Sequence, residues 1–441
     1  MSETIAFKPD FEENLEPELL PIVNQAILKV HSRCNLDCDY CYVYNLGDSS
    51  WKEQPPLMSD STVDVFAERL HEYLEPRHPF GFAITFHGGE PLLAPPEFYD
   101  ETAYKLRQAA GPRTVLQLGM QTNATLLNSE YLDVFRRNQI KLGISIDGSR
   151  EANDRHRVNH AGKSSYDKTM AGIELLKSSR YGRLFEGVLA VVDIENDPIE
   201  TIETLYSTLA TKIDLLLPHG NWETPPPGLE TDEGRESTPY GKWLATIFDW
   251  WFPDEAFTTR IRTFDSIMHT LGGDRSTVES IGGEALGNLV VVETDGSYEL
   301  VDTLKSTPGR VSKTGLNVFK HSINEANRFM TKRERQLGVL TLAQECQTCP
   351  IVEQCGSGYA PHRYSREKRF ANRSIYCQDL AYIISHIYGR MHEQSVLSDI
   401  RSNLQRNKVE VPYYLPGNPS RQLISMLQEE HQNFSSSGSS A

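Results

Sequence analysis

The first half of the chain alternates between short apolar, β-branched runs and longer amphipathic stretches. The runs have the length and composition of buried strands, and the stretches repeat apolar residues at helical spacing. The expected strands are residues 25–30, 82–91, 114–123, 141–148, 184–193 and 213–220, and the expected helices are 59–74, 96–110, 128–139, 165–179 and 198–210. This alternation predicts repeated βα units and a parallel sheet.

Six such units correspond to most of a TIM-type barrel. We therefore expect an α/β fold with a partial (β/α)6 barrel over residues 23–220. In parallel βα barrels the chemistry lies at the C-terminal ends of the strands. Polar or glycine-rich clusters follow the expected strands here, as a cysteine-rich loop and as HGGEP, QTNAT, SIDGS and LPHGNW. The pattern predicts one active site at that end of the barrel.

The second half of the chain has a different character. A Pro- and Gly-rich connection precedes two helical segments, and an Asp-Gly pair between β-rich runs predicts a hairpin over residues 289–302. Helices are expected near 324–337 and 378–404, and the Ser-rich end is expected to be disordered. The expected parts are an N-terminal segment (1–22), the barrel (23–220), a bridging helical region (221–285), a cysteine-rich auxiliary domain (286–391), and a C-terminal helix with a disordered tail (392–441).

Charge and hydropathy exclude several classes of partner. The 441 residues include 60 acidic and 44 basic ones, for a formal net charge of -16. This charge argues against a nucleic-acid surface and against docking on anionic lipid. No apolar run approaches the roughly 20 residues that span a bilayer, and the acidic N-terminus is unlike a secretory leader. We expect a cytoplasmic protein that binds no nucleic acid and no membrane.

Three cysteines in the loop after the first strand predict a reactive iron-sulfur centre. Cys34, Cys38 and Cys41 are spaced C-x3-C-x2-C and supply three thiolates. A 4Fe-4S cluster held by three thiolates keeps one iron open to a small molecule. Zinc would need a fourth ligand, for which His31 is the nearest candidate, and this spacing is not usual for zinc.

The other four cysteines lie near the C-terminal end and predict a closed cluster. They are Cys346, Cys349, Cys355 and Cys377. Four thiolates would complete the coordination of a cluster that handles electrons. A zinc ribbon stays open as an alternative for this set. Disulfides are disfavoured because the cysteines are few for a chain of this length.

The chain resembles the radical S-adenosylmethionine (SAM) enzymes, through C-x3-C-x-Tyr-C at Cys34 to Cys41 and GGEP at Gly88 to Pro91. The resemblance implies that the three cysteines hold a 4Fe-4S cluster whose open iron binds the methionine part of SAM. It also implies that reductive cleavage yields a 5′-deoxyadenosyl radical, which abstracts a hydrogen atom from the substrate. An electron donor such as flavodoxin or ferredoxin is expected as a partner.

The same resemblance implies SAM contacts at the strand ends. Tyr40 is expected to pack near the adenine, and Gly88, Gly89 and Glu90 are expected to line the methionine amino group. Asn123 and Ser145 are expected near the ribose, and Arg157 is expected to meet the carboxylate. Glycines allow close approach of the backbone, and an arginine fork suits a carboxylate. The alternative for the glycines is an ordinary turn, and for the Asn and Ser it is helix capping.

The C-terminal cysteine segment is similar to the SPASM extension of radical enzymes that modify peptides and proteins. The full extension holds two auxiliary clusters, and this chain retains the cysteines of the second. Val301 and Tyr359 stand where cysteines of the first would be, so we expect one auxiliary 4Fe-4S cluster. Asp302 takes the place of an aspartate that serves as a base in protein-serine-oxidising relatives, which makes it a candidate proton acceptor. The alternative is a turn residue that ends a strand.

From about residue 23 to 391 the chain looks most like maturases of ribosomally made peptides (RiPPs) of the FxsB, Grr and Xye type. The stretches LKVHSRCNLDCDYCYVYN and GSGYAPHRY carry this resemblance. Such enzymes join an aromatic ring carbon to the β-carbon of a residue two positions later, forming a three-residue cyclophane with loss of two hydrogens. The resemblance implies a precursor peptide as the substrate, with the auxiliary cluster accepting an electron and Asp302 a proton. His219, Asn221 and Trp222 are expected near the peptide.

Three other functions remain open from the sequence. Thioether formation, epimerisation, or oxidation of a protein serine or cysteine as in sulfatase maturation would use the same cluster residues. An electron carrier would bind two clusters but would have no use for GGEP beside an open iron. A zinc-dependent structural module would need neither iron nor a reductant.

Overall fold

The computed structural model describes residues 22–252, 259–276, 278–282, 289–337 and 342–406. Contacts divide the chain into two compact units. The first comprises residues 1–220, 258–260 and 285–340, and the second comprises 221–257, 261–284 and 341–441. The predicted N-terminal segment, up to residue 21, and the predicted disordered tail, from residue 407, lie outside the described residues. The five-part division predicted from the sequence stays a prediction.

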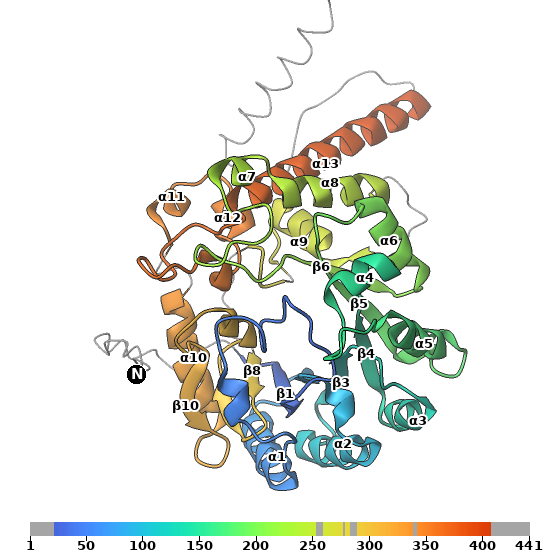
Figure 1. Ribbon diagram of the computed structural model, residues 1–441, viewed down its shortest axis with the longest axis vertical. Coiled ribbons are helices and arrows are strands. Elements are labelled where there is room, and N and C mark those ends of the chain that lie inside the picture. Colours follow the sequence, from blue (N-terminus) through green and yellow to red (C-terminus); the bar gives the residue numbers. More distant parts are fainter. Residues whose placement is uncertain (1–21, 253–258, 277, 283–288, 338–341, 407–441) are drawn as a thin grey trace, which may run out of the picture. The chain divides into compact units, whose positions relative to one another are not determined.

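The first unit contains a sheet in which six strands run parallel in chain order (Figure 1). These strands are β1 (Gln25–His31), β2 (Gly81–Gly88), β3 (Val115–Thr122), β4 (Ile140–Ser145), β5 (Phe185–Val191) and β6 (Lys212–Leu216). The helices that connect them are α1 (Asp60–Leu74), α2 (Pro96–Ala110), α3 (Ser129–Asn138), α4 (Arg150–His156), α5 (Tyr166–Lys177) and α6 (Pro198–Ser207). This order confirms the expected α/β fold with a partial parallel barrel.

Local sequence signals explain most of these boundaries. The Ser59 hydroxyl accepts the backbone N–H of Thr62 at 3.1 Å and caps α1, as Asn128 caps α3. The helix α4 was not predicted, because it is short and buries only Ala152 and Asn153, so it has no apolar stripe.

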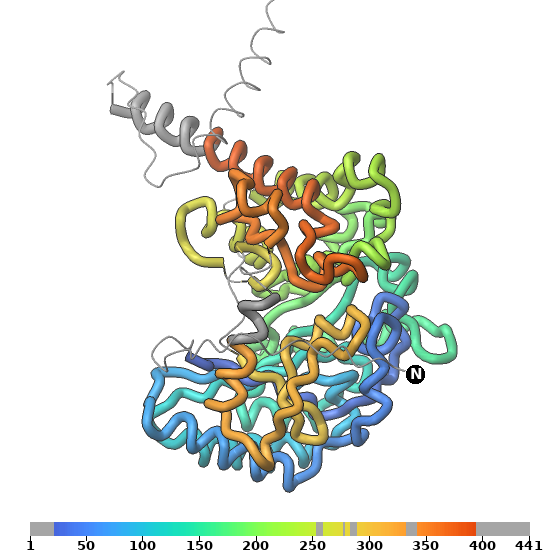
Figure 2. Tube along the Cα trace, turned by 90° about the vertical axis from the view of Figure 1, so that its left-hand side faces the viewer, coloured from blue at the N-terminus to red at the C-terminus, as the bar shows by residue number. Residues whose placement is uncertain are grey.

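The sheet continues on the other side of β1, where later parts of the chain join it. The strand β8 (Leu289–Val292) pairs with β1 in parallel, and β9 (Ser297–Glu299) and β10 (Lys313–Asn317) follow in antiparallel order. Figure 2 follows this return of the chain to its first strands. The hairpin predicted at the Asp-Gly pair is therefore confirmed, whereas its attachment to β1 was not predicted.

The helix α10 (Ile323–Leu337) packs against α1 in the first unit. Arg69 of α1 donates to the carbonyl of Val318 at 3.0 Å, and Arg77 donates to the side-chain oxygen of Asn324 at 2.7 Å. These bonds hold the end of the β8–β10 segment on the barrel.

A buried group of charges lies beside the β8–β9 hairpin. Lys305, which is only 4% exposed, forms an ion pair with Glu293 and a second with Glu299 at 3.0 Å. Ser312 also donates to Glu299, at 3.2 Å. One ammonium thus compensates two buried carboxylates, which are costly to bury unpaired.

The second unit is mainly helical. It contains α7 (Asp232–Glu236), α8 (Pro239–Trp251), α9 (Arg262–Leu271), α11 (Gln344–Gln347), α12 (Val352–Cys355) and α13 (Cys377–Arg406). The apolar face of α8 packs on α13, and Trp243 is buried. Within the described part of the chain, no helix has the length and apolar composition needed to cross a membrane.

Candidate active site

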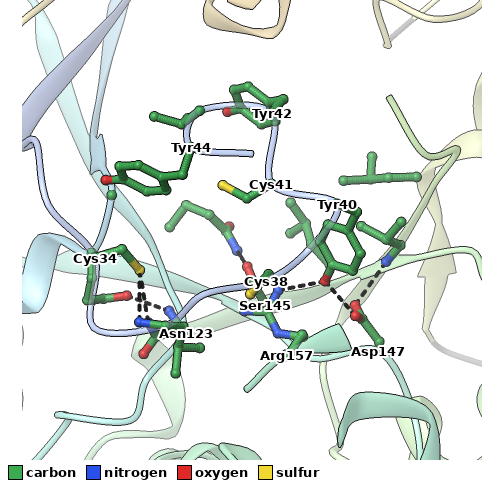
Figure 3. A pocket seen from close by; sticks show the side chains of 18 of the residues that line it. Cys34, Cys38, Tyr40, Cys41, Tyr42, Tyr44, Asn123, Ser145, Asp147 and Arg157 are labelled. Carbon is green, nitrogen blue, oxygen red and sulfur yellow. Dashed lines mark hydrogen bonds between the residues drawn. The ribbon is translucent and has the colours of Figure 1, made fainter. Parts of the chain in front are cut away.

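A cavity lies in the first unit at the C-terminal ends of the parallel strands (Figure 3). Each of the six strands contributes lining residues from its C-terminal end or from the loop that follows it. These residues lie within 34–44, 87–90, 121–123, 145–147, 189–191 and 216–219, and Arg157 completes the lining. The clusters that the sequence placed at separate strand ends therefore meet in one cavity.

Cys34 lies at the start of the cysteine loop, beside Asn123. Its Sγ accepts the backbone N–H of Leu36 at 3.4 Å, and Asn123 Nδ2 lies 3.9 Å away. Burial, with a smaller contribution from the nearby Glu90 carboxyl, raises the pKa of Cys34 to about 12. A thiol buried in this way ionises readily only when a metal takes the place of its proton.

Cys38 and Cys41 have similar surroundings. Burial raises the pKa of Cys38 to about 11, and the positive charge of Arg157 opposes that rise. Burial also raises the pKa of Cys41, against hydrogen bonds from the backbone N–H groups of Val43 and Tyr44. Donors and a cation directed at the sulfurs stabilise thiolates and tune iron-sulfur clusters.

The donor set of this loop fits the expected cluster. No three His, Cys, Asp or Glu side chains of the described residues stand close enough to hold a single metal ion. A 4Fe-4S cluster is larger than one ion, and its thiolate ligands bind separate irons, so they stand farther apart. Three half-buried thiols lining one cavity, with hydrogen-bond donors and a cation nearby, suit such a cluster.

Gly88 and Gly89 bring the end of β2 against the start of the cysteine loop. Gly88 has a φ of +136°, which disfavours any side chain. Gly89 donates to the carbonyl of His31 at 2.8 Å, and a Cβ at this position would overlap the Arg33 carbonyl and the Tyr44 hydroxyl. The two glycines are therefore required for this close approach.

We expect Gly89→Ala to destabilise the first unit by about 1–3 kcal/mol and to lower its iron content, because the Arg33 backbone must shift. The matched control is Gly81→Ala at the start of β2, where a Cβ would meet only the Val115 carbonyl, at 3.6 Å. Urea unfolding and iron analysis of both variants check this. Equal unfolding free energies and equal iron contents of the two variants would contradict the close contact between Gly89 and the cysteine loop.

Glu90 is bonded within the wall of the cavity. Its carboxylate accepts the backbone N–H of Leu92 at 2.9 Å, the Thr122 hydroxyl at 2.5 Å and the backbone N–H of Asn123 at 2.8 Å. Burial raises its pKa, and these three donors oppose the rise. Glu90 thus fastens the end of β2 to the end of β3, and its predicted contact with the methionine amino group stays a prediction.

Asn123 and Ser145 both line the cavity and both have protein partners. Asn123 donates to Asn35 Oδ1 at 2.9 Å and accepts from the Thr125 hydroxyl at 2.7 Å, so it holds the cysteine loop. The Ser145 hydroxyl accepts from Gln121 at 2.8 Å. Neither side chain caps a helix, which was the alternative for both, and their contacts with ribose remain predicted.

A chain of polar contacts joins Arg157 to Asp147 through Tyr40 (Figure 3). Arg157 donates to the Tyr40 hydroxyl at 2.9 Å, which donates to Asp147 at 2.5 Å, and Asp147 also accepts from the backbone N–H of Val191 at 3.0 Å. Burial raises the pKa of Asp147, against the charge of Arg157. Asp147 was not singled out from the sequence, although it belongs to the SIDGS cluster.

Asp302 lies in the first unit behind one wall of the cavity. It forms a buried ion pair with Lys29, and the Tyr42 hydroxyl donates to the same carboxylate oxygen at 2.9 Å. Burial opposes its ionisation, but Lys29 and then His87 outweigh burial and hold the pKa of Asp302 well below its usual range. Tyr42, His87 and His219 line the cavity in front of this carboxylate.

The other two residues that were expected near the peptide belong to the second unit. Asn221 accepts the backbone N–H of Glu223 at 2.9 Å, and the Trp222 indole donates to the carbonyl of Arg373 at 2.8 Å. Their proximity to a peptide stays a prediction.

The second cysteine set gathers in the second unit. Burial raises the pKa of Cys355 to about 12, and Cys377 and Cys349 lie near enough to add to the rise. The sulfur of Cys346, which is also buried, lies 3.2 Å from the Ser357 hydroxyl. These four thiols, all among the described residues, could hold a cluster, whereas no three of them stand close enough to hold a single zinc ion.

Val301 and Tyr359, which were expected to replace cysteines of a further cluster, are both buried. Val301 is 6% exposed and Tyr359 is 5% exposed, and the Tyr359 ring packs edge-on against His362 at 5.6 Å. The number of auxiliary clusters stays a prediction.

Comparison with known proteins agrees with this arrangement. Residues 28–208 match the model of the Radical SAM superfamily. A serine-type anaerobic sulfatase-maturating enzyme of Bacteroides thetaiotaomicron is 28% identical over 350 residues, covering 76% of this chain and 81% of that protein. A cysteine-type anaerobic sulfatase-maturating enzyme of Clostridium perfringens is 25% identical over 381 residues, covering 84% of this chain and 98% of that protein.

A solved structure of native anSMEcpe with bound AdoMet has the same fold. The TM-score is 0.70 at 22% identity, with 84% of this chain and 98% of that chain covered. At this identity the likeness concerns the fold alone.

Proposed function

Because residues 28–208 belong to the radical SAM superfamily, we propose that the chain is a peptide maturase that removes two hydrogens from a ribosomally made precursor and joins two of its side chains. The new bond links an aromatic ring carbon to the β-carbon of a residue two positions later. The reaction needs an electron donor, such as flavodoxin or ferredoxin.

The radical SAM domain binds a 4Fe-4S cluster and SAM, which together supply a 5′-deoxyadenosyl radical that takes a hydrogen atom from the substrate. Cys34, Cys38 and Cys41, which line the cavity, would hold the cluster. Arg157, whose Nε is buried without a hydrogen-bond partner among the described residues, offers its guanidinium to the SAM carboxylate.

The observation that carries the proposed loss of two hydrogens is the buried ion pair of Asp302 with Lys29, beside the Tyr42 hydroxyl at the cavity. A carboxylate whose pKa is held far down by Lys29 is a weak base and accepts a proton only from a strong acid. A ring carbon that regains aromaticity after the new bond forms, with loss of one electron, releases a strongly acidic proton. Asp302 therefore suits this step, with the Tyr42 hydroxyl between it and the cavity.

The electron released in that step needs an acceptor. The four cysteines of the second unit support one auxiliary 4Fe-4S cluster, which would accept it. A zinc ion in the same place would leave the reaction without this acceptor, because zinc has no redox chemistry.

A second candidate function is oxidation of a serine or cysteine side chain to an aldehyde. The similarity to serine-type and cysteine-type sulfatase-maturating enzymes over most of the chain favours it. It uses the same SAM site and also removes hydrogens, but it ties no residues together. Oxidation also releases one electron and one acidic proton from the substrate radical, so Asp302 suits either reaction, and the products distinguish the two.

Product analysis tests the proposal. The reconstituted enzyme is incubated with SAM, a reductant and peptides encoded beside its gene, and the products are analysed by tandem mass spectrometry and hydrazide labelling. Crosslinking is supported by a product that has lost two hydrogens, does not fragment between the linked residues and does not react with hydrazide. A hydrazide-reactive product supports the second candidate, and an unchanged mass with inverted stereochemistry excludes both.

We expect Asp302→Asn to slow product formation roughly a hundredfold while SAM still binds, because the amide cannot accept the proton. Asp64→Asn is the control, since it removes a carboxylate from an exposed pair with Lys105. Rates and SAM affinity are measured for both. Wild-type rates in Asp302→Asn would remove Asp302 as the proton acceptor.

A further inference from the structure

We propose that His87 is the hydrogen-bond donor that positions the peptide substrate in the cavity, and that Lys29 and Asp302 fix the ring in the required tautomer. The identity of the ligand as a peptide rests on the proposed function. The tautomer rests on the geometry of the first unit alone.

Lys29 lies at the centre of the arrangement. It belongs to β1 and is 2% exposed. Its ammonium is paired with Asp302 and lies 3.0 Å from His87 Nδ1 on the neighbouring strand β2. Asp302 is itself buried and also accepts from Tyr42. The ammonium is therefore held in place from two sides.

The contact between Lys29 and His87 determines where the imidazole proton resides. An ammonium has only donors, so the His87 Nδ1 atom must accept, and a neutral ring then carries its hydrogen on Nε2. Burial and the Lys29 charge lower the pKa of His87 to about 4, which agrees with a neutral ring. A protonated ring would direct an N–H group at the ammonium.

The remaining ring nitrogen is free for a ligand. His87 lines the cavity, and its side chain is 25% exposed although Nδ1 is engaged. Among the residues that the structure describes, no hydrogen bond is formed by Nε2. The ring thus presents one neutral N–H donor to whatever fills the cavity beside it.

The chemistry of this donor favours an amide carbonyl over a carboxylate. Asp302 already compensates the Lys29 charge, so no net positive charge is left at this wall, whereas Arg157 supplies one elsewhere in the cavity. A neutral N–H donor in a cavity that the Tyr42 and His219 rings also line suits a backbone carbonyl oxygen of a peptide.

The tautomer is tested by long-range proton–nitrogen NMR of the full chain labelled with 15N-histidine, at neutral pH. The signals of His87 are those that disappear in His87→Gln. We expect the Nε2–H form in the wild type, and a population of the Nδ1–H form in Lys29→Met. A charged or Nδ1–H ring in the wild type, or an unchanged tautomer in Lys29→Met, would overturn the assignment.

The donor role is tested by binding, without chemistry. The probe is a fluorescent peptide selected from a random display library on the reconstituted, SAM-loaded protein. His87→Gln places an amide N–H near the position of Nε2, whereas His87→Asn places it near Nδ1. We expect wild-type affinity for the first and roughly tenfold weaker binding for the second. Equal affinities of the two variants would refute the donor role.

The two proposals fail separately. A protein whose peptide binding depends on His87 but which yields no crosslinked product keeps the donor role and loses the proposed function. A crosslinking enzyme whose His87→Asn variant binds the probe as the wild type does keeps the function and loses the donor role.

Discussion

Replacing Cys38 by alanine is expected to abolish SAM cleavage completely while leaving the auxiliary cluster in place. Cys38 is one of the three thiols that line the cavity and are available to the cluster. Two thiolates do not hold a 4Fe-4S cluster firmly. Iron should fall from about eight to about four per chain after anaerobic reconstitution, with acid-labile sulfide in parallel.

The matched control for this variant is Cys349→Ala, in the other cysteine set. We expect it to retain SAM cleavage but to form no product, because the electron released on crosslinking lacks its acceptor. Wild-type amounts of product from Cys349→Ala would remove the electron-transfer role of the second set. About four iron with about one zinc in the unmodified protein would show that this set binds zinc.

Lys305→Met is expected to destabilise the first unit by about 3–5 kcal/mol. The side chain keeps its length but loses its charge, so Glu293 and Glu299 are left buried together without a cation. Urea unfolding at constant pH measures the loss.

The size of this loss depends on pH. Burial raises the pKa of Glu299 from 4.5 to about 7. The positive charge of Lys305 opposes this rise, and the negative charge of Glu293 adds to it. Because that pKa lies above the unfolded value, the contribution of Glu299 to stability is present below about 4.5 and is lost as the pH rises through about 7. Without Lys305 the carboxylates avoid charge only by protonation, so the defect should be larger at pH 8 than at pH 5.

The control is Lys313→Met, which removes the cation of an exposed pair with Glu53. Such pairs contribute little, and a change within about 0.5 kcal/mol is expected. If Lys305→Met unfolds at the same urea concentration as this control, the buried ion group does not stabilise the fold.

The elements of the barrel could be predicted because their signals are local. The helix at residues 96–110 is bounded as the periodicity indicated, and the helix expected over 59–74 begins at the Ser59 cap. The helix α4 was missed because seven residues with two buried side chains carry no periodic signal. The partners of β8 were missed because strand pairing is a contact between distant parts of the chain.

The site was predictable to the same extent. The spacing of Cys34, Cys38 and Cys41 and the glycines of GGEP predicted the cluster and the SAM site, because ligand spacing and backbone freedom are properties of a few consecutive residues. Only the tertiary structure decided that Asp302 pairs with Lys29 across 273 positions and that the pair faces His87. Burial and charge at a residue depend on what the fold brings beside it, so the sequence could propose Asp302 but could determine neither its charge nor its neighbours.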